Sequence, residues 1–86
     1  MSNGRLLFSI YTRQDCCLCE EMWLGLKKWQ RQYSFDVEFI DIDQDPALQR
    51  RFAARIPVLA VGDSEICQYH LDDVTLGRFL NKNGRQ

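Results

Sequence analysis

The sequence begins with two hydrophobic patterns of different period placed end to end. Residues 6–11 form a short apolar run rich in strand-forming side chains, which predicts a buried strand. The next apolar side chains recur every three or four positions, which puts them on one face of a helix; they are Leu18, Met22, Leu26, Trp29 and Tyr33. A further strand after this helix predicts a right-handed crossover between two parallel strands.

The rest of the chain supplies that strand and four more elements. Residues 35–42 alternate between apolar and acidic side chains, which is typical of a strand. Pro46 suits the first position of a short helix after Asp45. An apolar strand is predicted at 56–61, with a turn at Gly62, a hairpin partner at 65–69 and a last helix at 72–80. The order β-α-β-α-β-β-α predicts an α/β fold, a mixed sheet with helices on its faces.

Length and charge narrow the class of protein. The 86 residues fit one domain, 1–86, and a hydrophobic fraction of 45% argues against a disordered chain. The net charge of −1 gives no general attraction to nucleic acid or to an anionic membrane. No run approaches the ~20 apolar residues of a membrane span, and no secretory signal is recognisable. We therefore expect a cytoplasmic monomer with neither a nucleic-acid nor a membrane partner.

Three of the four cysteines are clustered where the first strand meets the first helix. In a reducing compartment such a cluster is usually reactive or metal-binding. Cys16 and Cys19 form a Cys-x-x-Cys pair in the first helical turn, with Asp15 as the predicted N-cap, and the spacing allows a disulfide. Helix N-terminal N–H groups stabilise a thiolate. We expect Cys16 to be the attacking thiol and Cys19, one turn further in, the resolving thiol, whereas Cys67 is expected to be a core residue.

Four segments, in order and at matching intervals, resemble a known family. They are Leu-Leu-Phe-Ser-Ile-Tyr-Thr-Arg at 6–13, Asp-Cys-Cys-Leu-Cys-Glu at 15–20, Phe-Ile-Asp-Ile-Asp at 39–43 and Arg-Ile-Pro-Val-Leu at 55–59. The chain resembles the short bacterial glutaredoxin-like proteins of the thioredoxin fold over about residues 6–80. The resemblance implies a three-layer, thioredoxin-like fold with a mixed four-stranded sheet and helices on both faces.

The resemblance also implies roles for residues outside the cysteine cluster. It implies that the Ile56–Pro57 bond is cis and that the Ile56 backbone pairs with a bound thiol peptide. Arg13 matches a basic position that helps hold the glutathione carboxylate. Asp73, the second of an acidic pair with Asp72, matches a residue that contacts the glutathione amino group.

The sequence departs from the family pattern in two places. Glutaredoxins usually carry a Gly-Gly pair just before those acids, whereas this chain has Tyr69-His70, whose side chains would crowd a close approach of glutathione. The usual Pro-Tyr pair between the cysteines is replaced by Cys17-Leu18. Thiol exchange is expected despite both changes, with glutathione as a candidate reductant.

These observations predict a thiol-disulfide oxidoreductase of the glutaredoxin or thioredoxin type that serves cell redox homeostasis. Its expected substrates are a disulfide-containing protein or a glutathione mixed disulfide, and it requires no metal and no other cofactor. One alternative is a non-catalytic adaptor, because fold does not fix function. The other is a metal or iron–sulfur module with Cys16, Cys17 and Cys19 as ligands, completed by Cys67 or His70.

Overall fold

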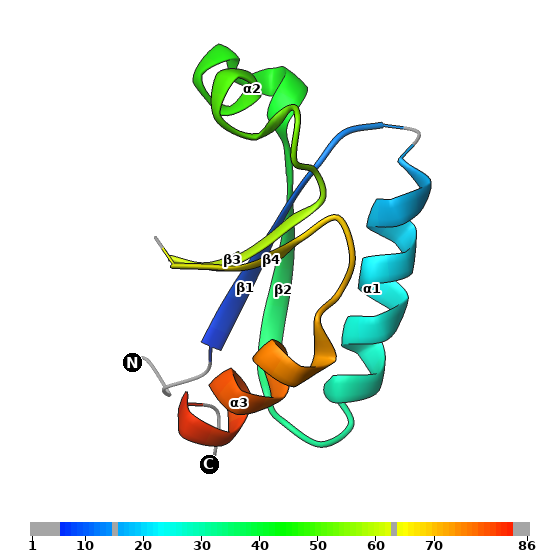
Figure 1. Ribbon diagram of the computed structural model, residues 1–86, viewed down its shortest axis with the longest axis vertical. Helices are drawn as coiled ribbons and strands as arrows, with labels where there is room; N and C mark the ends of the chain where they lie inside the picture. Colours follow the sequence, from blue (N-terminus) through cyan, green and yellow to red (C-terminus); the bar gives the residue numbers. More distant parts are fainter. Residues whose placement is uncertain (1–5, 15, 63, 84–86) are drawn as a thin grey trace.

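The predicted alternation of strands and helices is present in the computed structural model, which describes residues 6–14, 16–62 and 64–83. Figure 1 shows the sheet crossing the molecule with helices around it. In chain order the described elements are β1 (Leu6–Thr12), α1 (Cys17–Trp29), β2 (Phe35–Asp41), the short 3-10 helix η1 (Ile42–Gln44), α2 (Pro46–Phe52), β3 (Val58–Val61), β4 (Ser64–Gln68) and α3 (Asp73–Asn83).

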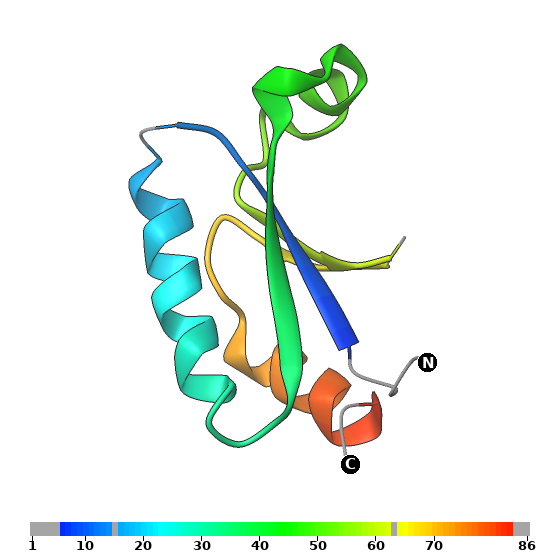
Figure 2. The same cartoon turned by 180° about the vertical axis from the view of Figure 1, so that it is seen from behind.

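The four described strands form one mixed sheet in the order β2-β1-β3-β4. β1 lies inside the sheet and runs parallel to β2, with Ile10 opposite Phe39. On its other side β1 is antiparallel to β3, and β3 is antiparallel to β4. Because β1 and β2 are parallel, the chain between them must cross over, and α1 makes that connection. Figures 1 and 2 show the molecule from opposite sides, and in both views α1 runs beside the sheet.

Helices cover both faces of the sheet, which confirms the three-layer prediction. Side chains alternate across a strand, so neighbouring residues of β1 enter different clusters. Phe8 and Ile10 pack with α1, α3 and β3 in the larger cluster, whose other fully or nearly fully buried members are Met22, Leu26, Phe35, Leu59, Leu76 and Leu80. Tyr11 packs on the α2 side, where its ring stacks on Phe52 at a centroid distance of 4.1 Å.

Element boundaries follow local hydrogen bonding. Asp45 caps α2 with its side chain and Pro46 occupies the first turn, as predicted. β2 ends one residue earlier than the predicted strand, because the Asp41 side chain accepts the Asp43 N–H and starts η1 at Ile42. None of the helices in the described ranges is long and apolar enough to span a bilayer.

Candidate functional site

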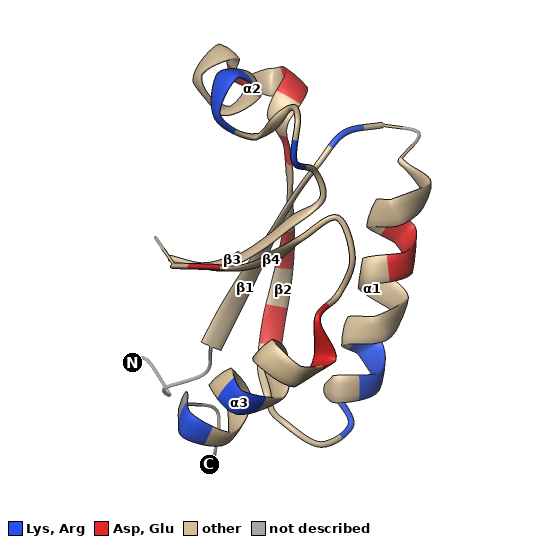
Figure 3. Cartoon of the chain, in the orientation of Figure 1, with Lys and Arg blue, Asp and Glu red and all other residues tan. Residues whose placement is uncertain are grey.

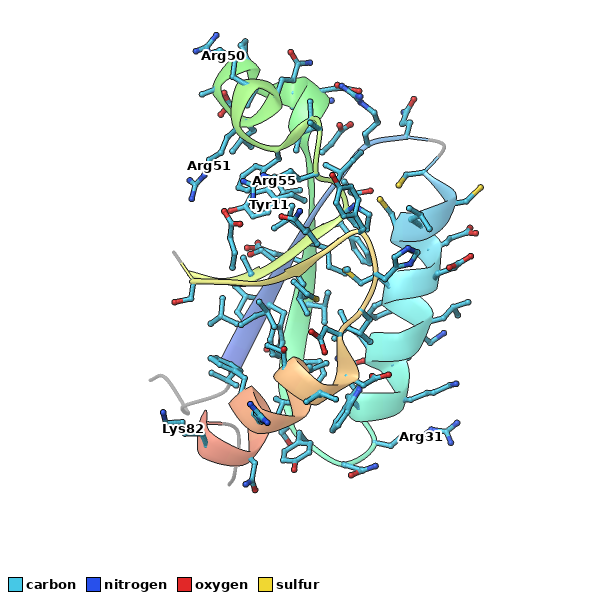
Figure 4. All side chains as sticks on the ribbon, in the orientation of Figure 1. Tyr11, Arg31, Arg50, Arg51, Arg55 and Lys82 are labelled. Carbon is cyan, nitrogen blue, oxygen red and sulfur yellow. The ribbon has the colours of Figure 1, made fainter. Side chains whose placement is uncertain are left out.

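Cys16 caps the N-terminus of α1. Its backbone is extended, at φ −100° and ψ 106°, and its Sγ accepts a hydrogen bond from the Cys19 N–H at 3.3 Å. The predicted cap, Asp15, lies outside the described residues; the observed cap is one residue later in the sequence. A sulfur in this position faces N–H groups that have no partner within the helix, and these stabilise a thiolate. In Figure 4, sulfur atoms gather at this end of α1.

The three clustered cysteines differ in exposure. Cys17 is exposed, Cys16 is half-buried and Cys19 is buried, with 7% of its surface accessible. Burial, and after it the hydrogen bond that the Cys19 thiol donates to Cys16, raises the pKa of Cys19 to about 11. At neutral pH Cys19 therefore keeps its proton, and a substrate disulfide meets Cys16 before it can reach Cys19.

An open pocket of about 510 Å³ lies beside the cysteines. All three cysteines line it, and its other lining residues are Thr12, Arg13, Glu20, Trp23 and Phe39. The pocket is therefore shared between the end of β1, the first two turns of α1 and the edge strand β2. Trp23 is partly buried and lines the pocket beside the cysteines.

Arg13 lies in the pocket with its guanidinium engaged. Its Nε donates to both carboxylate oxygens of Asp43 at 3.2 Å, and a terminal nitrogen contacts the same carboxylate at 2.9 Å. This hydrogen bond raises the pKa of Arg13 and lowers the pKa of Asp43. Gln49 also donates to Asp43 at 3.0 Å. The structure thus brings Arg13 to the cysteines and pairs it with a carboxylate from η1.

The segment before β3 is bonded to the residue that follows β4. The Ile56–Pro57 peptide bond is cis, and the Pro57 carbonyl accepts the Tyr69 N–H at 2.8 Å. The Tyr69 hydroxyl donates to the Ala54 carbonyl at 2.7 Å. The φ of Tyr69 is 69°, in the left-handed region that favours glycine. Glutaredoxins usually carry Gly-Gly at this position, and here a tyrosine adopts the left-handed conformation that glycine favours. Its side chain extends to the Ala54 carbonyl.

Asp73 lies away from the cysteines. Its carboxylate accepts a hydrogen bond from the Trp29 indole N–H at 2.8 Å. Trp29 ends α1, whereas Cys17 begins it, and the helical rise over those twelve positions amounts to ~18 Å. In Figure 1 the start of α3 lies toward the far end of α1 from its cysteine-bearing turn. The structure places Arg13 beside the cysteines but joins Asp73 to the opposite end of the helix.

Phe39 was not singled out by the sequence analysis. Its ring meets that of Trp23 edge to face at a centroid distance of 5.3 Å, and 52% of its surface is exposed. The available signal was the alternation of Phe35, Val37 and Phe39, which puts all three on the face toward α1. Alternation does not show where a covering helix ends, so the exposure of Phe39 needed the structure.

The metal-binding alternative receives no geometric support from the part of the chain that the structure describes. Within residues 6–14, 16–62 and 64–83, there is no group of three or more His, Cys, Asp or Glu side chains arranged to hold a metal ion. Cys67, one of the two candidates for a fourth ligand, is half-buried and packs against the main core cluster.

The strand order, the helices on both faces and the cysteines at the start of α1 define a thioredoxin-fold domain. A variant thioredoxin from Halobacterium salinarum is similar in structure, with a TM-score of 0.64 and 17% identity over 99% of this chain and 80% of that one. Thioredoxin 1 from Thermosipho africanus gives a TM-score of 0.58 and 17% identity over 90% and 97% of the two chains. These similarities show the fold.

The chain belongs to the glutaredoxin-like domain family (DUF836), which it matches over residues 8–81. The solution structure of protein Ne2328 from Nitrosomonas europaea is similar to it, with a TM-score of 0.83 and 36% identity over 92% of this chain and 98% of that one. A search of curated proteins gave no match.

Proposed function

We propose that this protein is a thiol-disulfide oxidoreductase with Cys16 as the nucleophile and Cys19 as the resolving thiol. The observation that carries the proposal is the arrangement of the two sulfurs. Cys16 lies at the helix cap, where its Sγ accepts the Cys19 N–H, while Cys19 is buried one turn further along. A substrate can reach Cys16, and Cys19 lies next to Cys16. A two-thiol exchange needs this arrangement, because the substrate reacts first with the outer thiol and the inner thiol then reacts with the outer one.

The reaction proceeds through a mixed disulfide. The Cys16 thiolate forms a bond to one sulfur of the substrate disulfide, and the other substrate sulfur leaves as a thiolate. Cys19 then gives up its proton to solvent, bonds to the Cys16 sulfur and releases the second substrate thiolate. The substrate gains two electrons, and the protein retains a Cys16–Cys19 disulfide that an external thiol reduces. No metal or other cofactor takes part in these steps.

We assign the positioning of the substrate to the Ile56 backbone next to Pro57 and to Arg13 in the pocket. The Ile56 backbone, next to Pro57, would align an extended substrate chain, a contribution of orientation and not of chemistry. Arg13 would contact a substrate carboxylate with a guanidinium that is already bonded to Asp43 through Nε and one terminal nitrogen. Asp73 is left out of this proposal, because its carboxylate is bonded to Trp29.

We place the reaction in the cytoplasm, where clustered thiols are kept reduced between turnovers. The substrates would be disulfide-containing proteins or glutathione mixed disulfides, with glutathione as a candidate reductant. The protein would act as a monomer.

A titration in glutathione redox buffers, with mass-spectrometric mapping of every cysteine, tests the proposal. We expect a reversible Cys16–Cys19 disulfide, or glutathione attached at Cys16. Cys16→Ser should abolish exchange, whereas the matched variant Cys17→Ser should keep it. An unreactive Cys16 in the folded protein would contradict the proposal and favour the adaptor alternative. Metal that co-purifies and blocks Cys16 would favour the metal-binding alternative.

A further inference from the structure

The pocket beside Cys16 has an aromatic wall that the exchange reaction itself does not require. Trp23 of α1 and Phe39 of β2 build this wall, with their rings edge to face at 81°. The Lys27 ammonium lies 5.7 Å from the Trp23 ring centroid, which adds a cation–π contact. Two elements hold the wall in place, yet half of Phe39 stays exposed to solvent. A large apolar surface held open beside a reactive sulfur is suited to contact with a ligand.

The two charged side chains that line the pocket, Arg13 and Glu20, offer an anionic ligand little attraction. The Arg13 guanidinium is paired with Asp43, so its positive charge is largely neutralised by a partner within the protein. Glu20 is exposed and also lines the pocket. Glutathione carries two carboxylates and one ammonium group at neutral pH, so the Glu20 carboxylate repels it, while the Arg13 guanidinium already has a carboxylate partner in Asp43. In Figure 3 acidic positions mark the first turns of α1, while the basic positions of this helix lie toward its other end.

The pocket is continuous with the proposed reactive centre. Cys16, Cys17 and Cys19 all line it together with the two aromatic rings. A chain bonded through sulfur to Cys16 would therefore lie beside the pocket that Phe39 and Trp23 also line. At the position before the acidic pair, where glutaredoxins usually carry Gly-Gly, the Tyr69 hydroxyl donates to the Ala54 carbonyl.

We propose that the wall formed by Trp23 and Phe39 receives an apolar side chain adjacent to the cysteine of a polypeptide substrate, so that the protein selects polypeptide disulfides over glutathione disulfide. This inference rests on the oxidoreductase function proposed above and names its substrate class. The chemistry is unchanged: the peptide disulfide gains two electrons and leaves as two thiols, while Cys16 and Cys19 lose two electrons and two protons to form their disulfide.

The test compares three disulfides as oxidants of the reduced protein. Two are symmetric peptide disulfides that differ only in the residue after cysteine, Phe in one and Ser in the other; the third is oxidised glutathione. We expect the Phe peptide to react about tenfold faster than the Ser peptide, the size of discrimination that a small apolar pocket supplies, and oxidised glutathione to be slower than both. Rates with dithiothreitol correct for the intrinsic reactivity of each disulfide.

Variants of Phe39 and Leu24 test whether the preference for the Phe peptide arises at the aromatic wall. Phe39→Thr keeps a strand-forming residue at this position and should reduce the Phe-over-Ser preference to less than about twofold. Phe39→Ala provides a second test of the same wall. Leu24→Ala is the matched control: Leu24 is an exposed apolar residue of α1, 56% accessible, that does not line the pocket. Circular dichroism confirms that each variant is folded.

Three results would overturn the inference, and they are distinguishable. Equal rates for the Phe peptide, the Ser peptide and oxidised glutathione would remove the substrate preference and leave the oxidoreductase function intact. A preference that Phe39→Thr and Phe39→Ala both retain would place the selecting surface elsewhere. Failure of all three disulfides to oxidise Cys16 would contradict the proposed function itself, and the inference with it.

Discussion

At the scale of residues, three thiols within four positions acquire different properties from where they sit on one helix turn. Cys16 is the cap, Cys17 points outward and Cys19 is buried. The sequence predicts an outer Cys16 and an inner Cys19, because a Cys-x-x-Cys pair at a helix start has one outer and one inner thiol, but it predicts Asp15 and not Cys16 as the cap. The pairing of Arg13 with Asp43 was not predicted, because the partners are thirty residues apart and meet only through tertiary structure.

The raised pKa of Cys19 predicts a pH dependence of stability. The unfolded chain releases this proton near pH 9, the ordinary value for the thiol, whereas the folded protein keeps it until about 11. The folded state then binds more protons, so the free energy of unfolding falls as pH rises from 9 to 11. Urea titrations of the reduced protein at pH 7.5, 9 and 10.5 should show this fall.

Cys19→Ala is the control for that experiment, because it lacks the titrating thiol and keeps the other cysteines. Its free energy of unfolding should fall less steeply above pH 9 than that of the wild type. If the free energy of unfolding fell equally with pH in both proteins, burial would not raise the pKa of Cys19 in the folded state.

At the scale of elements, α1 connects the site to the rest of the fold. Its first turn carries the cysteines, and its last residue, Trp29, donates to Asp73 at the start of α3. Gly25, in the middle, leaves room for Leu71: a Cβ added there would lie 2.6 Å from the Leu71 Cδ2. A glycine inside a helix lowers its stability, and here the close approach of Leu71, in the segment before α3, gives Gly25 a packing role.

The bond between Trp29 and Asp73 predicts a structural role for this aspartate. Asp73→Ala should lower the free energy of unfolding by about 1 kcal/mol, the net value of a typical hydrogen bond. Asp73→Asn keeps an acceptor oxygen, so its free energy of unfolding should fall by less. In a double-mutant cycle with Trp29→Phe, the two effects should couple.

Glutathione-dependent reduction of the oxidised protein is the discriminating readout. Its rate should be the same for Asp73→Asn and the wild type. A large loss of that rate with unchanged stability would instead support the role in glutathione binding that the family resemblance implies for Asp73.

At the scale of the whole molecule, most of the fold follows from hydrophobic periodicity and turn residues. The element order and the mixed sheet were predictable, because apolar spacing separates strands from helices and the crossover rule fixes β1 and β2 as parallel. The three-layer arrangement was implied by the family resemblance. The edges of the pocket were not predictable. The exposure of Phe39 depends on how far α1 covers β2, and the backbone of Tyr69 depends on its bonds to Pro57 and Ala54.

Because β1 is paired on both sides, its buried residues should carry much of the stability. Phe8 is fully buried and makes edge contacts with the rings of Phe35 and Phe79. Phe8→Ala should cost about 3–5 kcal/mol, a large part of the roughly 5–15 kcal/mol that stabilises a small domain. Leu7→Ala, at an exposed neighbouring position, should change stability by less than about 0.5 kcal/mol. Denaturant titration with tryptophan fluorescence measures both, and similar costs would contradict the assigned core.

The central claim is that Cys16 attacks and Cys19 resolves, and trapping the mixed disulfide tests it most directly. The Cys19→Ser variant, reduced and then treated with a peptide disulfide, should stop with one peptide bonded to Cys16, as peptide mapping by mass spectrometry would show. The wild type should pass through that species and end with the Cys16–Cys19 disulfide and free peptide. A peptide attached to Cys17 in the variant, or no adduct at all, would contradict the account.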